Sequence, residues 1–343
     1  MKVSCRLYVE VTEPEDLLTL DFDALPQPLF VMGGGSNLLF TSDFPGTVLH
    51  LAIRFLDSAL PGSARNDKVS VISTKAEGRV EKSVVLVRVG AGVVFDDFCA
   101  WAAQEGLWGP ENLSLIPGEV GASAVQNIGA YGVEAKDIID TVHAFDRITR
   151  TFVDIPGADC AYGYRASRFK TDWKGRYLIT AVTFRLSTVP APKLDYGGVR
   201  RALGDLAPSP AVIRDTIIGI RREKLPDPEE IGSAGSFFCN PVIEREHFER
   251  IVALAKAENG PEYEVPHYDV GDRVKVPAAW MIDQCGFKGM RLGGAQVYPK
   301  QPLVIVNATG EATPDEIVAL ERRVIDTIKD KYGIELHPEV EHV

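Results

Sequence analysis

Residues 116–132 read IPGEVGASAVQNIGAYG, a run in which small residues leave little side-chain bulk along the backbone. A flat or extended ligand could therefore lie directly against the main chain. Asn127 supplies both a hydrogen-bond donor and an acceptor, and Tyr131 adds an aromatic ring with a hydroxyl group. A packed loop without a ligand is the alternative interpretation of this stretch taken alone.

The first glycine loop of the chain, residues 33–37 (GGGSN), follows an apolar run at 28–32 that predicts a β-strand, and residues 116–132 contain the second. Successive backbone N–H groups in such a loop can surround an anion, and a pyrophosphate is a natural occupant. The loop is not a Rossmann fingerprint, because no G-x-G-x-x-G opens a helix here. It is not a P-loop either, because no Gly-Lys-Ser/Thr follows. A tight surface turn is the alternative.

The first half of the chain alternates short β-branched runs with loops, which predicts a strand-rich region. Further strands are expected at residues 47–53, 69–72 and 84–89. A helix is expected at 96–107, where Asp96 or Asp97 can cap the start and Gly106 can end the helix.

The composition changes between residues 187 and 212, where several prolines make a helix unfavourable up to the last of them. We place a domain transition in this region. The second half of the chain has its own helices. One is expected at 244–258, with apolar residues on one face. Another follows the capping box at 313–316 (TPDE) and ends at Gly333.

The chain has 343 residues, of which 45% are hydrophobic and 25% are charged, a composition typical of a globular protein with a sizeable core. This length favours two or three domains. The net charge of -11 and the isoelectric point near 5.1 argue against an extended nucleic-acid interface or an anionic membrane partner. A local basic pocket for a phosphorylated small molecule is compatible with this charge.

The cysteine pattern predicts neither a disulfide framework nor a zinc site, because the five cysteines are odd in number and none belongs to a C-x-x-C pair. We expect reduced thiols in a cytoplasmic protein and no bound metal. The N-terminus shows no signal peptide. No segment approaches the roughly 20 apolar residues that are needed to cross a bilayer.

Three further segments carry polar chemistry that the glycine loops lack. Residues 164–170 (YRASRFK) place cations beside a hydroxyl group, and arginine commonly binds carboxylates through two hydrogen bonds. Residues 235–241 (GSFFCNP) hold a serine between a glycine and two aromatic residues. Residues 221–226 (RREKLP) offer cations to a phosphate or, alternatively, to a helix C-terminus. A solvated basic segment and an ordinary packed loop are the alternatives for the first two.

In this order and spacing, the segments resemble the UDP-N-acetylenolpyruvoylglucosamine reductase family over essentially the whole chain. The matching segments are GGGSNLLF, IPGEVGASAVQNIGAYGVE, YRASRF, KLPDP, GSAGSFFCNP, AAWMIDQCGFKG and HPEV. The resemblance implies an α+β protein with a vanillyl-alcohol-oxidase-type FAD-binding domain, made of two α/β subdomains, at 1–205. A smaller α+β substrate domain would follow at 206–343, with its C-terminal strip, 334–343, returning to the active site.

The resemblance also implies three groups of site residues. Catalysis is assigned to Arg165, Ser236 and Glu339. FAD contacts are assigned to Gly33, Gly34, Gly35, Ser36, Asn37, Pro117, Gly118, Gly121, Asn127, Tyr131, Gly132 and Arg221. Substrate contacts are assigned to Tyr196, Lys224, Asn240 and Gln301, and the tyrosine is typical of the longer-loop type of the family.

The reaction that the resemblance implies is the NADPH-dependent reduction of UDP-N-acetylglucosamine-enolpyruvate to UDP-N-acetylmuramate, a cytoplasmic step of peptidoglycan precursor synthesis. Arg165 and Glu339 would stabilise the enolate that forms, and Ser236 would protonate its carbon atom. We expect the FAD to be bound non-covalently and the chain to be a monomer. Nucleic acids and membranes are not expected as partners.

Two features depart from the family pattern. Relatives carry an Asn-Thr-Phe-Gly segment before the first strand, which is not seen after Met1, and Cys239 lies inside the serine segment. Another FAD-dependent oxidoreductase of the same fold, acting on a different small molecule, is the alternative function. A nucleotide sensor without catalysis is a third possibility, but a sensor would not need Arg165, Ser236 and Glu339 together.

Overall fold

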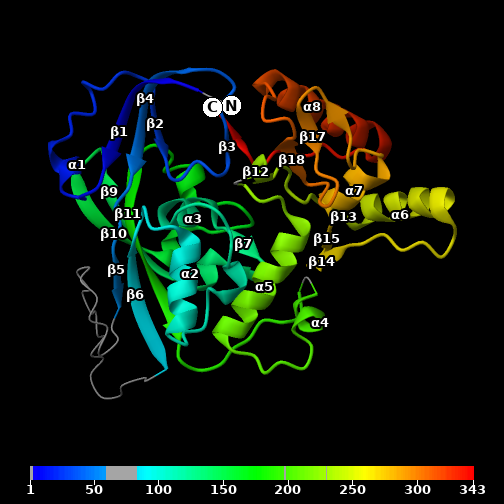
Figure 1. The fold of residues 1–343 in the computed structure, drawn as a ribbon, viewed down its shortest axis with the longest axis horizontal. Coiled ribbons are helices and arrows are strands. Elements are labelled where there is room, and N and C mark those ends of the chain that lie inside the picture. Colours follow the sequence, from blue (N-terminus) through cyan, green and yellow to red (C-terminus); the bar gives the residue numbers. More distant parts are fainter. Residues whose placement is uncertain (1–2, 59–82, 197, 229) are drawn as a thin grey trace. The chain divides into compact units, whose positions relative to one another are not determined.

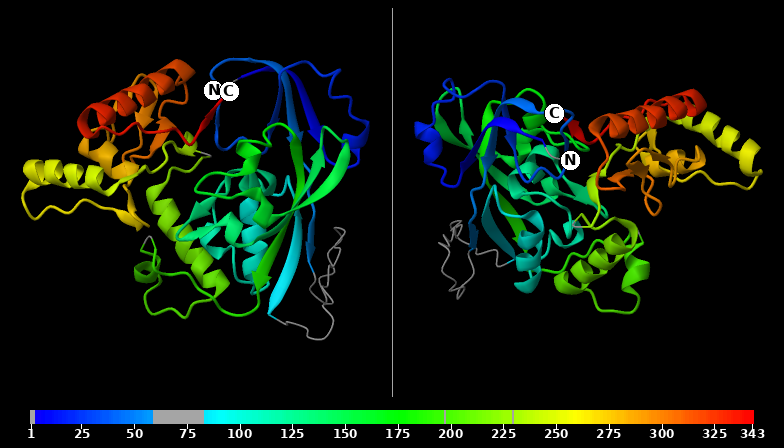
Figure 2. Two further views of the ribbon diagram at one scale, coloured as in Figure 1. Left: turned by 180° about the vertical axis from the view of Figure 1, so that it is seen from behind. Right: turned by 45° about the horizontal axis from the view of Figure 1, so that its top comes forward.

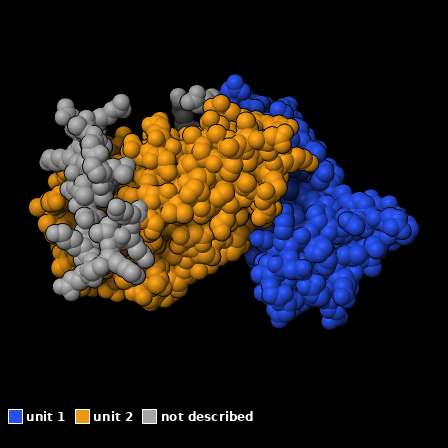
Figure 3. Space-filling model, turned by 90° about the horizontal axis from the view of Figure 1, so that it is seen from below, with its two compact units in different colours: residues 1–3, 37–43, 224–343 blue, residues 4–36, 44–223 orange. Residues whose placement is uncertain are grey.

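The computed structural model describes residues 3–58, 83–196, 198–228 and 230–343. The chain forms two compact units, and each is built from more than one segment (Figure 3). Unit 1 contains residues 1–3, 37–43 and 224–343, and unit 2 contains residues 4–36 and 44–223. The strand expected at 69–72 lies outside the described residues.

The first sheet of unit 2 consists of three parallel strands in the order β1 (Cys5–Val11), β4 (Phe44–Leu51) and β2 (Leu29–Met32). β2 confirms the strand expected at 28–32, and β4 overlaps the strand expected at 47–53. In the register of this sheet, His50 of β4 lies between Glu10 of β1 and Met32 of β2. The end of β2 therefore delivers the triglycine loop to the position of His50.

The second sheet of unit 2 is antiparallel and has the order β10 (Thr151–Pro156), β9 (Ile139–Asp146), β11 (Tyr177–Ser187), β6 (Val84–Gly90) and β5 (Leu56–Ser58). β6 confirms the strand expected at 84–89. The helices α2 (Phe95–Gln104) and α3 (Val120–Gln126) lie along one face of this sheet (Figure 1 and Figure 2). Phe98 of α2 stacks on Phe184 of β11 with ring centroids 4.5 Å apart, which joins this helix to the sheet.

The helix α2 begins just before the aspartates that were expected to cap it. Val94 occupies the N-cap position without a side-chain hydrogen bond. Asp96 lies in the first turn, where its carboxylate accepts hydrogen bonds from the Leu115 N–H and from the Arg214 guanidinium. The prediction that Asp96 or Asp97 caps the helix was therefore wrong, because Asp96 binds partners that are distant in the sequence.

The proline-rich region 187–212 contains the short helix α4 (Val199–Leu203), so the expectation that no helix forms there was wrong. The prolines flank α4 and do not interrupt it. The next helix, α5 (Pro210–Lys224), begins at the last proline of the region, since proline is well tolerated in the first turn of a helix.

The helix α5 packs within unit 2, although the expected domain boundary at 205/206 would place it in the second domain. Three isoleucines of α5 are buried in one cluster with Trp108: Ile213, Ile217 and Ile220. The break between the two units consequently follows Glu223. The assignment of residues 1–205 to cofactor binding and 206–343 to substrate binding stays a prediction.

The described part of unit 1 contains three helices and three small sheets, of which the two larger ones form its body. The four-stranded sheet has the order β12 (Gly232–Ser236), β18 (Val304–Asn307), β17 (Ala295–Val297) and β16 (Arg291–Leu292). The three-stranded sheet has the order β13 (Val242–Glu244), β15 (Arg273–Lys275) and β14 (Tyr268–Val270). The helices are α6 (Arg245–Asn259), α7 (Ala278–Gln284) and α8 (Pro314–Tyr332). α6 confirms the helix expected at 244–258.

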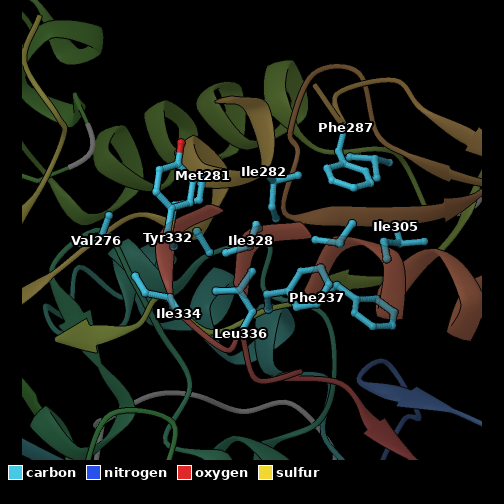
Figure 4. Close-up of a cluster of buried hydrophobic side chains, with 14 of the residues drawn as sticks. Phe237, Val276, Met281, Ile282, Phe287, Ile305, Ile328, Tyr332, Ile334 and Leu336 are labelled. Atoms are coloured by element: carbon cyan, nitrogen blue, oxygen red, sulfur yellow. The ribbon is translucent and has the colours of Figure 1, made fainter. Parts of the chain in front are cut away.

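A single hydrophobic cluster holds the elements of unit 1 together (Figure 4). Phe237 follows β12, Met281 lies on α7 and Ile328 lies on α8, and each is at most 1% exposed. Burial of such large apolar side chains is the dominant favourable term in folding. This cluster therefore fixes the segment that follows β12.

The helix α8 begins and ends as the sequence predicts. The Thr313 hydroxyl accepts a hydrogen bond from the Glu316 N–H at 3.3 Å, and the Glu316 carboxylate accepts one from the Thr313 N–H at 3.0 Å. Pro314 occupies the first turn, which completes the expected capping box. Gly333, with φ of +67°, ends the helix.

The C-terminal residues of unit 1 pair with a segment from the first half of the chain. β19 (Glu341–His342) lies parallel to β3 (Leu38–Leu39), and the Val343 N–H donates to the Leu39 carbonyl at 2.9 Å. Leu39 is buried in the hydrophobic cluster of unit 1. The remaining short elements are α1 (Asp16–Thr19), β7 (Gly129–Ala130) and β8 (Val133–Glu134). Of the helices in the described ranges, none combines the length and apolarity that a membrane crossing requires.

The packing of α5 predicts the effect of Ile217→Ala on stability. Ile217 is fully excluded from solvent, so truncation should leave a cavity and lower the free energy of unfolding by about 2–5 kcal/mol. Arg222→Ala, at an exposed position of the same helix, is the control and should change this free energy by less than about 0.5 kcal/mol. Urea denaturation followed by circular dichroism measures both. Similar small losses in the two variants would contradict the packing of α5 in unit 2.

Candidate functional site

The two glycine loops lie against each other in unit 2. A Cβ atom added at Gly118 would come within 2.8 Å of the Ser36 hydroxyl oxygen, so any other residue there would force the Ser36 side chain to move. Gly118 also has φ of +111° and Gly35 has φ of +72°, and both values favour glycine. The fold thus brings together the two segments that the sequence indicated.

Glu119 fills the space beside the first two glycines of the triglycine loop. A Cβ atom at Gly33 would lie 3.1 Å from the Glu119 carboxylate, and one at Gly34 would lie 3.6 Å from its Cγ atom. Glycine at position 33 therefore makes room for Glu119, whereas a Cβ atom at position 34 would be in ordinary van der Waals contact with it. His50 Nε2 lies 3.0 Å from Oε1 of this carboxylate. Burial raises the pKa of Glu119, and the His50 contact acts in the opposite direction.

The helix α2 holds the loop around Gly118 in place. The Phe95 N–H donates to the Gly118 carbonyl at 2.9 Å, and the Leu115 N–H donates to the Asp96 carboxylate. Burial disfavours the charged form of Asp96, but the Arg214 guanidinium and the Leu115 N–H together hold its pKa below the usual value. The carboxylate of Asp96 therefore stays ionised. It joins the loop to α2, on which Asp96 lies, and to α5, which carries Arg214.

Asn127 is buried in the second glycine loop, and protein groups already use its side chain. Its amide nitrogen donates to the Glu134 carboxylate at 3.0 Å and to the Gly163 carbonyl at 2.7 Å. Its amide oxygen accepts from the Lys136 N–H at 3.0 Å. Both amide hydrogens are thus occupied, and the side chain shapes the loop. The contact of Asn127 with a cofactor stays a prediction.

Arg165 lies beside the same loop. Its Nη2 atom donates to the Gly129 carbonyl at 2.8 Å. Its backbone has φ of +54°, which is uncommon for a residue other than glycine. Backbone conformations of this kind persist where the surrounding structure requires them, and they occur frequently at functional sites.

A second polar cluster surrounds Tyr131, and the Arg221 guanidinium acts on its hydroxyl group. Burial raises the pKa of Tyr131 and lowers that of Arg221, while their mutual contact opposes both effects. Among the described residues, Nε of Arg221 and Oδ1 of Asn112 are buried without a hydrogen-bond partner. Asn112 donates to the Tyr131 carbonyl at 2.9 Å, so both unpaired atoms belong to neighbours of Tyr131. A ligand that pairs with them would remove a cost to folding.

Tyr196 borders the turn that follows Tyr131. A Cβ atom at Gly132, where φ is +80°, would lie 3.2 Å from the Cβ atom of Tyr196. The segment 129–132 therefore has three predicted site residues as neighbours: Arg165 at Gly129, Tyr196 at Gly132 and Arg221 at Tyr131. The structure brings these three predicted site residues together in unit 2.

Ser236 and Glu339 lie on paired segments of unit 1. The Glu339 N–H donates to the Phe237 carbonyl at 2.8 Å, and a β-bridge joins Phe238 to Pro338. Phe237 and Phe238 are both buried, whereas Ser236 is exposed. The aromatic pair therefore anchors the serine segment, and backbone pairing fixes the C-terminal strip beside it.

Asn37 contacts the C-terminal strip of unit 1. Its side-chain amide donates to the Glu339 carbonyl at 3.0 Å, and its own carbonyl accepts from the Glu341 N–H at 3.1 Å. The other residues of the triglycine loop, 33–36, belong to unit 2. Asn37 thus positions the strip that bears Glu339, and its contact with a cofactor stays a prediction.

The three predicted substrate contacts of unit 1 have different surroundings. The Asn240 side-chain oxygen accepts from the Ala278 N–H at 2.9 Å, which holds the start of α7. Gln301 precedes β18, and its side-chain oxygen accepts from the Leu303 N–H at 3.4 Å. Lys224 is the exposed last residue of α5. All three substrate assignments stay predictions.

Sequence reasoning assigned no role to three polar residues of unit 2: His50, Asn112 and Glu119. Glu119 stood inside the second glycine loop, where a charged residue among small ones was the available signal. His50 and Asn112 carried no local signal, because their partners come from other strands and loops. In the described part of the chain, no group of His, Cys, Asp and Glu side chains is arranged to hold a metal ion.

Comparison with known proteins identifies relatives over the full length. A family model described as FAD binding domain matches residues 6–151, and one described as UDP-N-acetylenolpyruvoylglucosamine reductase, C-terminal domain, matches residues 227–343. The UDP-N-acetylenolpyruvoylglucosamine reductase of Bacteroides fragilis (strain YCH46) is 44% identical, with 99% of this chain and 95% of the relative covered. That of Porphyromonas gingivalis (strain W83) is 42% identical, with 91% and 85% covered.

A solved structure shows the same fold. The crystal structure of UDP-N-acetylenolpyruvylglucosamine reductase from Thermus caldophilus matches with a TM-score of 0.61 at 21% sequence identity. The match covers 98% of this chain and 91% of that chain. Together with the FAD-binding domain model, it confirms the expected α+β architecture with an FAD-binding domain.

The contact between the loops predicts that Gly118→Ala weakens FAD binding. The added methyl group would meet Ser36 and would strain a positive φ, so we expect FAD affinity to fall by roughly 5- to 150-fold, the equivalent of about 1–3 kcal/mol. Gly106→Ala is the matched control, because Gly106 also has positive φ (+71°) but nothing lies within 4 Å of the added atom. Fluorescence titration of the apoprotein with FAD measures both. Equal losses of affinity would contradict a role for the loop contact.

Proposed function

Since the chain belongs to the UDP-N-acetylenolpyruvoylglucosamine reductase family, we propose that it reduces UDP-N-acetylglucosamine-enolpyruvate to UDP-N-acetylmuramate, with NADPH as electron donor. The observation that carries the proposal is the backbone pairing between the segment of Ser236 and the strip of Glu339. This pairing places a hydroxyl group and a carboxyl group on adjacent segments, and both are suited to acid–base chemistry. The product is a precursor of peptidoglycan.

FAD is the redox cofactor of this reaction, and the residues present fit a dinucleotide. The loops around Ser36 and Gly118 expose backbone beside small residues. The buried Nε of Arg221 and Oδ1 of Asn112 have no partner among the described residues. Bound FAD supplies hydride transfer between NADPH and the substrate. We propose that it is held without a covalent bond, by the residues of the two loops together with Tyr131 and Arg221.

Arg165 is proposed to stabilise the negative charge that develops on the substrate. When a hydride adds to the methylene carbon of the enolpyruvyl group, charge develops on the neighbouring carbon and its carboxylate. A guanidinium can bind such an enolate with two hydrogen bonds. A contact that is stronger in the transition state than in the ground state lowers the barrier. Glu339 is proposed to complete this arrangement beside the carboxylate.

Ser236 is proposed to give a proton to the carbon that carries the negative charge. Hydride at one carbon and a proton at the other convert the double bond to a single bond, and NADPH is oxidised to NADP⁺. A hydroxyl group is a weak acid, but the carbanion is a strong base, so the transfer is favourable. The exposure of Ser236 in unit 1 supports this role.

The remaining assigned residues would bind the substrate away from the reacting carbons. Lys224 is an exposed cation suited to a phosphate, and Tyr196 offers a ring and a hydroxyl group. Asn240 and Gln301 are assigned to further polar contacts. NADPH and nucleotide sugars are cytoplasmic metabolites, so we place the reaction in the cytoplasm. One chain carries all the assigned residues, which supports a monomer.

The proposal predicts a purified protein that carries FAD and oxidises NADPH only when the enolpyruvyl substrate is present. Acid precipitation should release the flavin into the supernatant, where chromatography identifies it as FAD. FMN in the supernatant, or flavin retained in the pellet, would contradict the cofactor assignment. NADPH oxidation at the same rate without UDP-N-acetylglucosamine-enolpyruvate would contradict the proposed reaction.

The role of Ser236 predicts that Ser236→Ala separates the two half-reactions. Reduction of the flavin by NADPH needs no proton on the substrate carbon, so it should stay nearly intact. Reoxidation of the flavin by the enolpyruvyl substrate should slow by roughly 100- to 10,000-fold, as is typical for the loss of a general acid. Rapid-mixing absorbance of the flavin measures each half-reaction separately, and Ser236→Cys should recover part of the loss because a thiol can also donate a proton.

Ser233→Ala is the matched control, because Ser233 lies on the same strand and its hydroxyl accepts a hydrogen bond from the Gly235 N–H. Both half-reactions should stay close to those of the unmodified protein. If Ser236→Ala slowed flavin reduction as much as flavin reoxidation, the hydroxyl of Ser236 would be structural and the proton would come from another group.

A further inference from the structure

Four side chains beside the triglycine loop form one hydrogen-bonded group that the proposed reaction does not use. His50 Nε2 lies 3.0 and 3.1 Å from the two carboxylate oxygens of Glu119. His50 Nδ1 lies 2.9 Å from the Tyr8 hydroxyl and 3.2 Å from Oε2 of Glu10. The register of the parallel sheet creates this group, because His50 pairs with Glu10 on one side and with Met32, which precedes the loop, on the other.

This group can satisfy its hydrogen bonds in two protonation states. With a neutral imidazole, the Tyr8 hydroxyl donates to Nδ1 of His50, and Nε2–H donates to Glu119. With a doubly protonated imidazole, Nδ1–H donates to Glu10, and Nε2–H still donates to Glu119. The Tyr8 hydroxyl, 3.3 Å from Glu10, can then donate to that carboxylate. The group can therefore gain a proton by exchanging one hydrogen bond, and each polar hydrogen still has an acceptor.

Glu119 and His50 are shielded from water, since their side chains are only 7% and 9% exposed. Charges in such surroundings are poorly screened and act strongly on near neighbours. Burial raises the pKa of Glu119, against the effect of His50. Burial also raises the pKa of Tyr8, and Glu10 adds to this effect, so the Tyr8 hydroxyl stays a hydrogen-bond donor.

Glu119 directly contacts the loop that we assign to the FAD pyrophosphate. Its carboxylate lies 3.1 Å from the position of a Cβ atom at Gly33, and its Cγ atom lies 3.6 Å from the corresponding position at Gly34. A pyrophosphate held by the backbone of this loop would bring negative charge close to the carboxylate. Two like charges in a poorly hydrated site repel each other, and the repulsion favours the uptake of a proton.

The ionisable groups that act on Glu119 are Tyr8 and Glu10 on β1, His50 on β4, and Arg54 shortly after β4. His50 and Arg54 favour the charged carboxylate, but burial outweighs both effects. Arg54 is the only permanent cation among these four groups, and its Nε atom donates to the Gly92 carbonyl at 3.2 Å. A proton on Glu119 or His50 is therefore the nearest source of compensating charge.

We propose that binding of FAD to residues 33–36 is coupled to the uptake of a proton by the Glu119–His50 pair. The pair would be negative before FAD binds and neutral afterwards, so the carboxylate would no longer oppose the pyrophosphate. This inference rests on the proposed position of FAD. Glu119 and His50 act on the cofactor through charge and position, and they do not touch the reacting atoms.

The coupling fixes the sign of the pH dependence. A pair that binds its proton more tightly in the FAD complex makes FAD bind more tightly at low pH. As the pH rises, the Glu119–His50 pair loses its proton first in the apoprotein and then in the FAD complex. The affinity for FAD falls over the pH range between these two events. For one proton, the limiting loss is about tenfold in affinity for each pH unit.

Titrations of the apoprotein with FAD at several pH values test this coupling. Flavin fluorescence gives the dissociation constant at several pH values between about 5.5 and 8.5. Isothermal titration calorimetry in two buffers with different ionisation enthalpies gives the number of protons taken up. For the unmodified protein, we expect net proton uptake and an affinity that falls as the pH rises.

Glu119→Gln keeps the size of the side chain and removes its charge. Its affinity for FAD should be nearly independent of pH and, at the upper end of the range, up to about tenfold higher than that of the unmodified protein. Proton uptake should disappear. His50→Gln is a second variant that should also lose proton uptake, and thermal unfolding of each apoprotein shows whether the variant is folded.

Glu10→Gln is the matched control, because Glu10 contacts the far side of His50. Proton uptake should persist in this variant, because the Glu119–His50 pair is unchanged. The coupling would be overturned if the affinity for FAD depended on pH equally in Glu119→Gln and in the unmodified protein. It would also be overturned if the unmodified protein took up no proton on binding FAD. Failure of the unmodified protein to bind FAD at any pH would instead overturn the cofactor assignment, and the coupling with it.

Discussion

A close approach between two loops organises unit 2. A methyl group added at Gly118 would meet the Ser36 side chain, which would have to move to accommodate it. The triglycine loop leaves the end of β2 in the parallel sheet, whereas α2 holds the second loop against the antiparallel sheet. Both sheets and the helix must therefore be in place before the loops can meet. The stacking of Phe98 on Phe184 is part of this arrangement, because it sets the position of α2.

Both units hold their predicted site segments by the same two means. In each unit, backbone hydrogen bonds fix the segment, and buried aromatic rings anchor the chain next to it. Phe237 and Phe238 do this for the serine segment of unit 1, as Phe95 and Phe98 do for α2 in unit 2. Rigid support of this kind reduces the entropy that a bound ligand would otherwise have to remove.

Local sequence patterns predicted the features that depend on local contacts. The capping box of α8, the helix α6 and the strand β2 were found because their signals lie within one element. The cap of α2 was not, because Asp96 binds Arg214, far along the chain. The place of α5 was missed for a similar reason, since its isoleucines pack on residues from other segments. The glycine loops were recognised, but the role of His50 depends on strand register, which no local pattern specifies.

The pairing of β3 with β19 has a consequence for synthesis on the ribosome. The side chain of Asn37 and the backbone of Glu339 are joined by a hydrogen bond across 302 positions of sequence. Residues 37–43 thus leave the ribosome long before the last residues exist, and the edge of β3 has no partner during that time. Unit 1 can complete its core only after translation ends. A nascent or C-terminally shortened chain would lack Glu339 in place, so only a finished chain would carry the complete set of catalytic groups that we assign.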